Sequence, residues 1–376
     1  MTTQATPINV DDPINAQVLA VSEDRIQGFV RDPFAAIATA SGLDEDLVCE
    51  RIRAMLEAGV IRRVRQTVLA TSLAPGALVA WKVPADLLDA TFDWMSQNDP
   101  FSGHVVIRST DTDSPGAAYR LWTTVKVPQG YDLEKHCAFL LTKTAAEAFK
   151  AMPAKKLFAL GVGHVRRKGM EPGSRSDEPG RAMDAIPVEL DALEWKTLPV
   201  LKDEFQPEEV HADPWSARAA KAGLSLEEFF AGADSLQAKG VIGRFSTFLE
   251  HHKKVAGQQR VASFNALFHW RVPAGREVEA GREVGRHHIM THAYWREGGP
   301  EFNGVNIMGV AHGQEKDKVL AHKAAIDEHL RQVGIEVSYT NVFWGGRSEI
   351  KPSEILPDRY RAWCKGLGID PGTMQA

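Results

Sequence analysis

Residues 32–61, DPFAAIATASGLDEDLVCERIRAMLEAGVI, decide the fold of the first part of this chain. Their apolar side chains, such as Leu47, Ile52 and Met55, recur at helical spacing. Gly42 and Gly59 stand where helices should end, because glycine tolerates the left-handed backbone of a helix C-terminus. The stretch therefore predicts a helix, a tight turn and a second helix, and a short strand over Ile61–Leu69 completes the outline of a winged helix-turn-helix domain.

The same pattern returns 181 residues later. The matched segments are Asp32–Phe34 with Asp213–Trp215, Gly42–Leu43 with Gly223–Leu224, Gly59–Ile61 with Gly240–Ile242, and, at an offset of 189, Trp81–Pro84 with Trp270–Pro273. His104 and Arg108 correspond to His292 and Arg296 at an offset of 188. Matches in the same order with small drifts in spacing indicate a tandem duplication.

The second part of each half alternates strand, helix, strand, strand, helix, strand, which is typical of a ferredoxin-like α+β sandwich. In half one the expected elements are Ala77–Val83, Leu87–Asn98, His104–Ser109, Arg120–Val127, Leu133–Ala151 and Lys156–Val162. In half two they are Val261–Val272, Val278–Arg286, Ile289–Arg296, Gly304–Ala311, Asp317–Val333 and Glu336–Phe343. The predicted fold class is thus α+β, built twice from a winged helix-turn-helix and a ferredoxin-like sandwich.

These patterns divide the chain into six segments. In order they are a helix-turn-helix domain (14–72), a ferredoxin-like domain (73–170), a linker (171–187), a second helix-turn-helix domain (188–256), a second ferredoxin-like domain (257–347) and a C-terminal tail (348–376). The linker is expected from the proline, glycine and serine residues of Glu171–Gly180.

Composition excludes several classes of protein. The chain has 376 residues, a net charge of −5 and three widely separated cysteines. An odd number of cysteines favours reduced thiols and a cytoplasmic setting. The polar, acidic start, Met1–Asp12, is unlike a secretory signal, and no apolar run is long enough for a transmembrane helix. The net charge provides no general attraction to nucleic acid.

The helix-turn-helix outline alone would favour DNA binding. However, the helix that would enter the groove begins with Asp44, Glu45 and Asp46, and its counterpart carries Glu227 and Glu228. Acidic residues suit the positive end of the helix dipole but repel phosphate, which supplies most of the affinity of DNA-binding proteins. We therefore expect DNA binding to be the weaker alternative.

Thr291-His292-Ala293-Tyr294-Trp295-Arg296 concentrates chemically active side chains in six residues. On a strand, His292, Tyr294 and Arg296 share one face. An imidazole beside a guanidinium suits a flat, anionic ligand. The alternative is an amphipathic edge strand whose polar side chains are solvated.

Other basic residues also cluster. Arg62, Arg63 and Arg65 follow the first helix-turn-helix and could bind carboxylates, or simply form a solvated strand. Ten of the thirteen histidines lie from His211 onwards. The pairs His251-His252 and His287-His288, with His269, His292 and His312, could ligate a metal or a haem iron. No HxxxH or HExxH pair lies on a convincing helix and no phosphate-binding glycine loop occurs, so no dedicated metal site is predicted.

Together these motifs resemble the siroheme decarboxylases, which are built like the Lrp/AsnC regulators. The matching segments are Pro33–Ala35, Gly59–Arg63, Tyr119–Trp122, His292–Arg296 and Lys156–Val162. Members of this family usually work as two paired subunits, and this chain looks like such a pair fused end to end. Half one lacks the tyrosine of the histidine strand, and half two lacks the Tyr-x-Leu-Trp strand, so either one composite site or one active and one degenerate site remains open.

The resemblance implies a decarboxylase that removes carbon dioxide from acetate side chains of siroheme to give didecarboxysiroheme, with no cofactor beyond the iron tetrapyrrole. It implies His292 and His104 as proton donors, with Arg296, Arg108 and Tyr294 also catalytic. The residues expected to bind the tetrapyrrole are Arg62, Arg63, Arg65, Tyr119, Trp122, Trp295, His287 and His288. The alternatives are an Lrp/AsnC-like regulator, a tetrapyrrole-binding protein without chemistry, and a purely structural scaffold. The fused pair makes a monomer plausible and leaves a homodimer open.

Overall fold

The computed structural model describes residues 6–69, 73–74, 76–160, 170–184, 188–250 and 264–376. The chain divides into two compact units. The first contains the described residues up to Leu69 and those from Val188 to Glu250, and the second contains the rest. Each unit therefore combines parts of both sequence halves.

The first unit contains both helix-turn-helix domains, as the repeat predicts. In half one these are α1 (Pro13–Ser22), α2 (Pro33–Ser41), α3 (Glu45–Glu57) and the strand β2 (Ile61–Val68). In half two they are α7 (Ala192–Lys202), η4 (Pro207–Glu209), α8 (Ser216–Lys221), α9 (Leu226–Ala238) and β9 (Ile242–Leu249). Gly42 ends α2 with a φ of 72°, in the left-handed region where a side chain would be strained.

The two wing strands belong to one sheet, which the sequence did not predict. β9 lies between β1 (Ile26–Gln27) and β2, and it pairs antiparallel with β2 from Ile61 opposite Leu249 to Val68 opposite Ile242. Each wing thus covers the edge of the other, and the two helix-turn-helix domains form a single unit.

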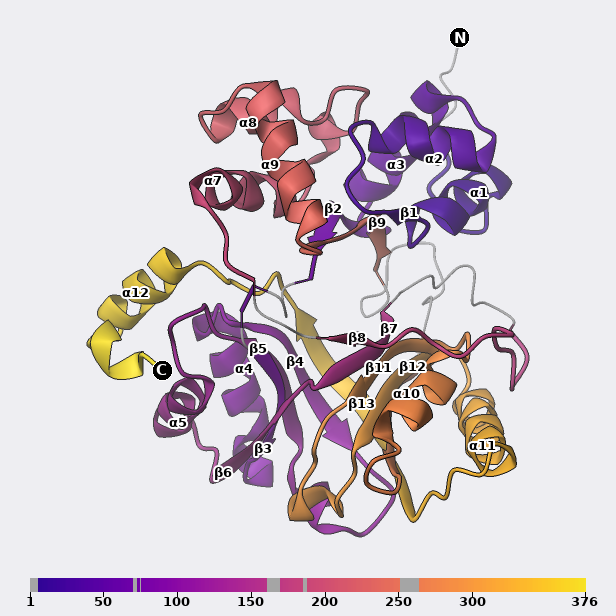
Figure 1. The fold of residues 1–376 in the computed structure, drawn as a ribbon, viewed down its shortest axis with the longest axis vertical. Coiled ribbons are helices and arrows are strands. Elements are labelled where there is room, and N and C mark those ends of the chain that lie inside the picture. Colours follow the sequence, from indigo (N-terminus) through magenta and orange to yellow (C-terminus); the bar gives the residue numbers. More distant parts are fainter. Residues whose placement is uncertain (1–5, 70–72, 75, 161–169, 185–187, 251–263) are drawn as a thin grey trace. The chain divides into compact units, whose positions relative to one another are not determined.

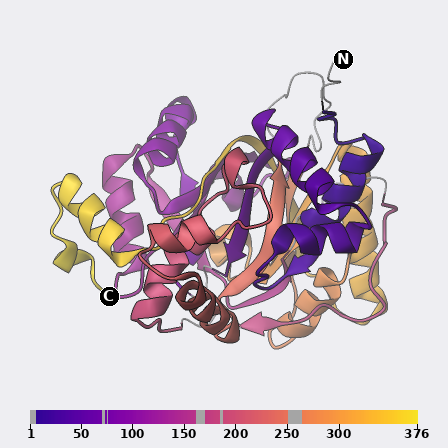
Figure 2. The same cartoon turned by 90° about the horizontal axis from the view of Figure 1, so that it is seen from above.

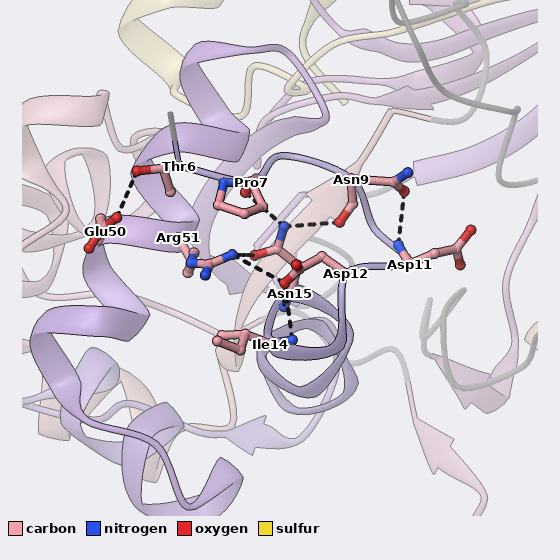
Figure 3. Close-up of polar contacts among 9 residues, drawn as sticks. All are labelled: Thr6, Pro7, Asn9, Asp11, Asp12, Ile14, Asn15, Glu50 and Arg51. Atoms are coloured by element: carbon pink, nitrogen blue, oxygen red, sulfur yellow. Dashed lines mark hydrogen bonds and ion pairs between the residues drawn. The ribbon is translucent and has the colours of Figure 1, made fainter. Parts of the chain in front are cut away.

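Arg51 of α3 is held inside the first unit (Figure 3). Its guanidinium is 8% exposed and donates to Asp12 at 3.1 Å and to the Asn15 side-chain oxygen at 3.4 Å. Arg53 donates to the Val210 carbonyl oxygen at 2.7 Å. Both basic side chains of this helix are therefore engaged within the protein, whereas Glu45 and Asp46 remain at its N-terminus.

The second unit contains both ferredoxin-like domains (Figure 1). Half one supplies β3 (Gly76–Lys82), η2 (Ala85–Leu87), α4 (Leu88–Asn98), β4 (Ser102–Ser109), η3 (Pro115–Ala118), β5 (Leu121–Lys126), α5 (Leu133–Lys143) and β6 (Ala148–Pro153). Half two supplies β10 (Phe264–Arg271), α10 (Glu277–Gly285), β11 (Met290–Trp295), η5 (Pro300–Phe302), β12 (Ile307–Gly313), α11 (Lys316–Gln332) and β13 (Tyr339–Ile350). The predicted α+β class and its duplication are confirmed.

These strands form one sheet in the order β6-β3-β5-β4-β13-β10-β12-β11-β7-β8, where β7 is Lys156–Leu160 and β8 is Met183–Asp184. The first four strands belong to half one and the next four to half two, and each set has the ferredoxin-like order. Two residues, Ala154 and Lys155, connect β6 directly to β7. β6 and β7 stand near opposite ends of this order although only two residues separate them in the chain. The sheet therefore curves so that these two strands lie near each other.

Three apolar clusters fill the second unit. Helices α4 and α5 pack on one face of the half-one strands, and α10 and α11 pack on one face of the half-two strands. The third cluster joins the two halves through their other faces, and its buried members include Trp122 and Val106 from half one and Leu267, Met308 and Phe343 from half two. We call these other faces the inner faces.

The C-terminal tail lies against half one. The helix α12 (Pro357–Gly366) buries Tyr360 and Cys364 in the same cluster as α4 and α5, and η6 (Pro371–Met374) follows it. In both cartoon views the yellow α12 lies beside the helices of half one (Figures 1 and 2). Residues 170–184 run along half two, where the Ser176 and Gly180 N–H groups donate to carbonyls of Arg286 and Arg282.

Two expectations for half one need correction, the end of one helix and the partner of one strand. The helix predicted over Leu133–Ala151 ends at Lys143, and Ala148–Pro153 form the strand β6 beside β3. Its alanines have high helix propensity, but pairing with β3 prevails. The strand predicted from Lys156 pairs with β11 of half two instead of closing half one, and its expected last residues, 161–162, lie outside the described residues. In half two, β13 runs seven residues past the predicted end at Phe343.

Candidate active site

The inner faces bring the histidine–arginine strands of both halves into one interior. On β11, His292 and Tyr294 lie opposite Val310 and Met308 of β12. On the other side of β12, the same two residues lie opposite Leu267 and His269 of β10. On β4, His104 and Val106 lie opposite Thr124 and Trp122 of β5. Val106, Trp122, Leu267 and Met308 are buried together in the cluster between the halves, so His104 and His292 project from the walls of that interior.

His292 belongs to a short polar chain in half two. Its Nδ1 lies 3.2 Å from the Thr291 hydroxyl, which lies 3.4 Å from Nδ1 of His312 and donates to the Val310 carbonyl oxygen at 2.9 Å. The imidazole is half-buried and stacks on the Tyr294 ring, with centroids 6.1 Å apart and planes at 13°. The threonine therefore fixes the orientation of the ring.

Arg296 and Arg108 occupy equivalent places at the boundary between the halves. Arg296 is 7% exposed, donates to the Met152 carbonyl oxygen of half one, and lies 4.5 Å over the Tyr294 ring. Arg108 is 4% exposed and donates to the Phe343 carbonyl oxygen of half two at 3.3 Å. Burial lowers the pKa of Arg108 to about 10 and raises the pKa of the Tyr294 phenol.

His104 has different neighbours from His292, its counterpart in half two. Its Nε2 lies 2.8 Å from the Ser348 hydroxyl on β13, near the point where β13 pairs with β4. The two histidines predicted as proton donors therefore both stand on the inner faces, each oriented by a hydroxyl group, but with different neighbours.

Trp122 and Tyr119 contribute to the core between the halves. Trp122 is fully buried, donates from Nε1 to the Tyr119 carbonyl oxygen at 2.7 Å, and packs 5.2 Å from the rings of Phe302 and Phe343. Trp295 lies on the opposite face of β11 from Tyr294, where its Nε1 donates to Glu297 at 2.7 Å and Lys155 sits 4.9 Å over its ring.

His287 and His288 lie between α10 and β11, beside residues 170–184. His288 lies 3.1 Å from the Ser174 hydroxyl, and His287 is 2% exposed with its ring 5.2 Å from that of His329. Burial and the neighbouring His329 lower the pKa of His287 to about 3, so it is neutral at ordinary pH. These two histidines pack on the side of the helices, away from the inner faces.

Arg62, Arg63 and Arg65 belong to the first unit. Arg63 forms an ion pair with Glu204 at 3.0 Å, and Arg65 lies 5.4 Å over the Phe248 ring. Burial and the neighbouring Arg63 lower the pKa of Arg65 to about 10. The trio with Arg244 concentrates positive charge on β2 and β9.

Sequence reasoning missed two inner-face residues, Lys126 and Asn265, which occur in no recognisable motif. It offered His269 and His312 as possible metal or haem ligands without placing them on the inner faces. His269 is 1% exposed, and neither ring nitrogen has a hydrogen-bond partner among the described residues. The strand period alone could have placed them once the pairing was known.

Within the described ranges, no group of three or more histidine, cysteine or acidic side chains is arranged to hold a metal ion. His251 and His252, which the sequence offered as ligands, lie outside those ranges. None of the described helices is both long and apolar enough to cross a bilayer.

Comparisons with known proteins agree with this architecture. Residues 29–62 match the family model for the siroheme decarboxylase NirDL-like HTH domain, and residues 73–159 match the AsnC-like ligand binding domain. The chain is 24% identical over 310 residues to the siroheme decarboxylase of Hydrogenobacter thermophilus. The aligned residues make up 81% of this chain and 86% of that protein. It is 23% identical to the siroheme decarboxylase NirDL subunit of Paracoccus pantotrophus, over 81% of this chain and 89% of the other.

Solved structures show the same fold. The crystal structure of the siroheme decarboxylase NirDL matches with a TM-score of 0.64 and 19% identity, over 94% of this chain and 97% of the other. A complex of NirDL with an iron-uroporphyrin III analogue matches with a TM-score of 0.62 and 18% identity, over 94% and 99%. In its domains and its fold, therefore, this chain is similar to proteins named siroheme decarboxylase: the two family models match its first half, and the solved structure matches the fold of both halves.

Proposed function

We propose that this chain is a carboxy-lyase that removes carbon dioxide from acetate side chains of siroheme to give didecarboxysiroheme, as a step of haem or haem d1 biosynthesis. The observation that carries the proposal is the placement of two equivalent histidine–arginine strands on the inner faces of one sheet. Its support is the similarity of 81% of the chain to proteins named siroheme decarboxylase.

The substrate chemistry matches these side chains. Siroheme carries acetate and propionate carboxylates around a flat ring, so its site needs cations for the carboxylates and a group that can deliver a proton. Arg296 and Arg108 supply guanidinium groups on the walls that also carry the histidines. In this proposal they orient acetate groups.

Decarboxylation breaks the bond between the acetate methylene and its carboxylate. Carbon dioxide leaves, and the electron pair of the broken bond stays on the methylene carbon, where the conjugated macrocycle of the substrate can delocalise it. One proton then converts the methylene to a methyl group. In the proposal His292 delivers this proton, with His104 as its counterpart, because imidazole exchanges protons near neutral pH.

Anaerobic incubation with siroheme, followed by mass measurement of the tetrapyrrole, tests the activity. Two successive losses of carbon dioxide are expected. Replacing His292 by alanine should lower turnover by about 10²–10⁴-fold, the usual contribution of a general acid, with siroheme affinity largely kept. His211→Ala, at an exposed histidine of the first unit, is the matched control and should keep full turnover.

Two alternatives predict different results. A red-shifted spectrum without loss of mass would make the chain a tetrapyrrole-binding protein without chemistry. A shift of operator DNA in a gel would favour an Lrp/AsnC-like regulator. The engagement of Arg51 and Arg53 inside the first unit counts against the regulator, because these cations are not free to contact phosphate.

A further inference from the structure

The interior between the inner faces has two equivalent ends, one formed by β10 and β12 of half two and the other by β3 and β5 of half one. Their side chains differ in charge. At the half-two end, Asn265 of β10 lies opposite His312 of β12. At the half-one end, the equivalent positions on β3 and β5 are Gly76, opposite Lys126. Each end also receives the arginine of the other half, because Arg108 reaches the Phe343 carbonyl and Arg296 reaches the Met152 carbonyl.

The half-two end is satisfied by the protein itself. Both terminal nitrogens of Arg108 donate to the Asn265 side-chain oxygen, each at 3.2 Å. His312 shares the Thr291 hydroxyl with His292. This end therefore offers one cation, Arg108, whose terminal nitrogens are already hydrogen-bonded to Asn265.

The half-one end holds two cations. A Cβ atom added at Gly76 would lie 3.5 Å from the Lys126 ammonium nitrogen, so the lysine fills the space that Asn265 occupies in the other half. Met152, whose carbonyl binds Arg296, pairs with Leu78, two residues from Gly76. His104 lies opposite Thr124, which shares a strand face with Lys126. The lysine, the arginine and the histidine thus converge on one end of the interior.

Neither cation is neutralised there. Among the described residues, no carboxylate acts on Lys126 or Arg296: after burial, the titratable group that shifts the pKa of Lys126 is Arg296, and the one that shifts the pKa of Arg296 is the Tyr294 phenol. Nε of Arg296 has no hydrogen-bond partner among these residues. Burial, followed by the positive charge of Arg296, lowers the pKa of Lys126 to about 7. Two adjacent, partly desolvated cations without a counter-ion form a site that a carboxylate would stabilise.

We propose that Lys126 and Arg296 form a carboxylate-binding site that holds an acetate side chain of the tetrapyrrole beside His104. The inference rests on the proposed function, and it adds a second cation to the acetate site of Arg296 at the half-one end. Lys126 acts as a positioning residue that no sequence motif identifies.

Two iron porphyrins separate the acetate contribution from the rest of the ligand. Iron uroporphyrin III carries acetates and propionates, whereas iron coproporphyrin III carries methyl groups in place of the acetates. Lys126→Met should weaken binding of iron uroporphyrin by about tenfold or more and leave iron coproporphyrin unchanged, because only the former loses a charge-assisted contact. Lys143→Met, on the exposed side of α5, is the control and should affect neither ligand.

The titration of Lys126 gives a readout that does not depend on catalysis. Competitive acetylation with acetic anhydride should show a midpoint near pH 7 in the free protein, with strong protection and an upward shift on adding iron uroporphyrin. Unchanged uroporphyrin affinity in Lys126→Met, or equal losses for both porphyrins, would overturn the inference. A wild-type chain that binds neither porphyrin would refute the proposed function instead, and an ordinary lysine midpoint near pH 10 would refute the site alone.

Discussion

At the scale of single residues, His269 shows how the interior constrains protonation. Its ring lies 5.0 Å from Phe343, 5.8 Å from Phe302 and 6.0 Å from Trp122, in a cluster that buries apolar side chains from both halves. Burial, reinforced by the positive charges of Arg108 and Lys323, lowers the pKa of His269 from 6.5 to about 3. The folded protein therefore keeps this imidazole neutral.

This burial predicts a loss of stability in acid. Between pH 6.5 and 3 the unfolded chain binds a proton at His269 that the folded chain does not, so the free energy of unfolding falls as the pH falls, by at most about 1.4 kcal/mol per pH unit. His269→Leu should reduce this slope, as measured by urea unfolding at pH 7.5 and 5.0. His211→Leu, at an exposed position, is the control, and an unchanged slope in His269→Leu would contradict the assignment.

Arg108 makes a second prediction at this scale. Removing its guanidinium leaves the Asn265 oxygen and the Phe343 carbonyl without their donor in a buried place. Arg108→Met should therefore lower the free energy of unfolding by about 1–3 kcal/mol, the usual cost of unsatisfied buried polar groups. Thermal and urea unfolding would measure it, with the exposed Arg359→Met as the control. Equal stability of the two variants would show that water replaces the guanidinium.

At the scale of elements, α12 is held by a buried polar chain. The Tyr360 hydroxyl lies 3.0 Å from Nδ1 of His136, whose Nε2 lies 3.5 Å from Asp99. Burial alone would raise the pKa of Asp99, but His136, the Ser102 hydroxyl and the Phe101 N–H hold it below its ordinary value. A charged carboxylate under α4 and α5 is thus tied, through one histidine, to the C-terminal helix.

Tyr360→Phe breaks this chain without changing the packing of the ring. The loss of one partner of a buried histidine should cost about 1–3 kcal/mol of unfolding free energy. Hydrogen exchange of residues 357–366 should accelerate, because the hydroxyl is a buried polar link between α12 and half one, beside the bond from Trp363 Nε1 to the Asn98 carbonyl oxygen. Tyr339→Phe, on β13 of half two, should leave exchange in α12 unchanged. Unaltered exchange in Tyr360→Phe would mean that the hydroxyl does not help to hold the helix.

The sequence predicts elements better than their partners. Helical spacing, glycine positions and the repeat place α3, α9, β4 and β11 within a few residues, because these signals are local. The end of α5 was missed because Ala145 and Ala146 favour helix, whereas β6 exists only through pairing with β3. Lys126 and Asn265 were missed for the same reason, since residues on different strands become neighbours only when the pairing is known.

At the scale of the whole chain, the halves exchange strands reciprocally. β7 of half one pairs with β11 of half two, and β13 of half two pairs with β4 of half one. The wings do the same in the first unit, where β2 pairs with β9. Each half alone would expose several unpaired strand edges and the apolar residues of the cluster between the halves. The duplication therefore behaves as one folding unit within each of the two compact units, and neither half is self-sufficient.

This reciprocity predicts how the chain responds to being divided. Residues 1–184 and 185–376, produced separately, should aggregate or remain unfolded, because β4, β11, β2 and β9 would each lack a partner. Produced together, they should copurify as a one-to-one complex on size-exclusion chromatography, because the missing partner restores every strand pairing. Deleting residues 154–160 from the first fragment removes β7 and should weaken the complex, whereas Lys143→Met, an exposed substitution in the same fragment, should have little effect. A soluble, cooperatively unfolding monomer of residues 1–184 would show that the strand exchange is dispensable.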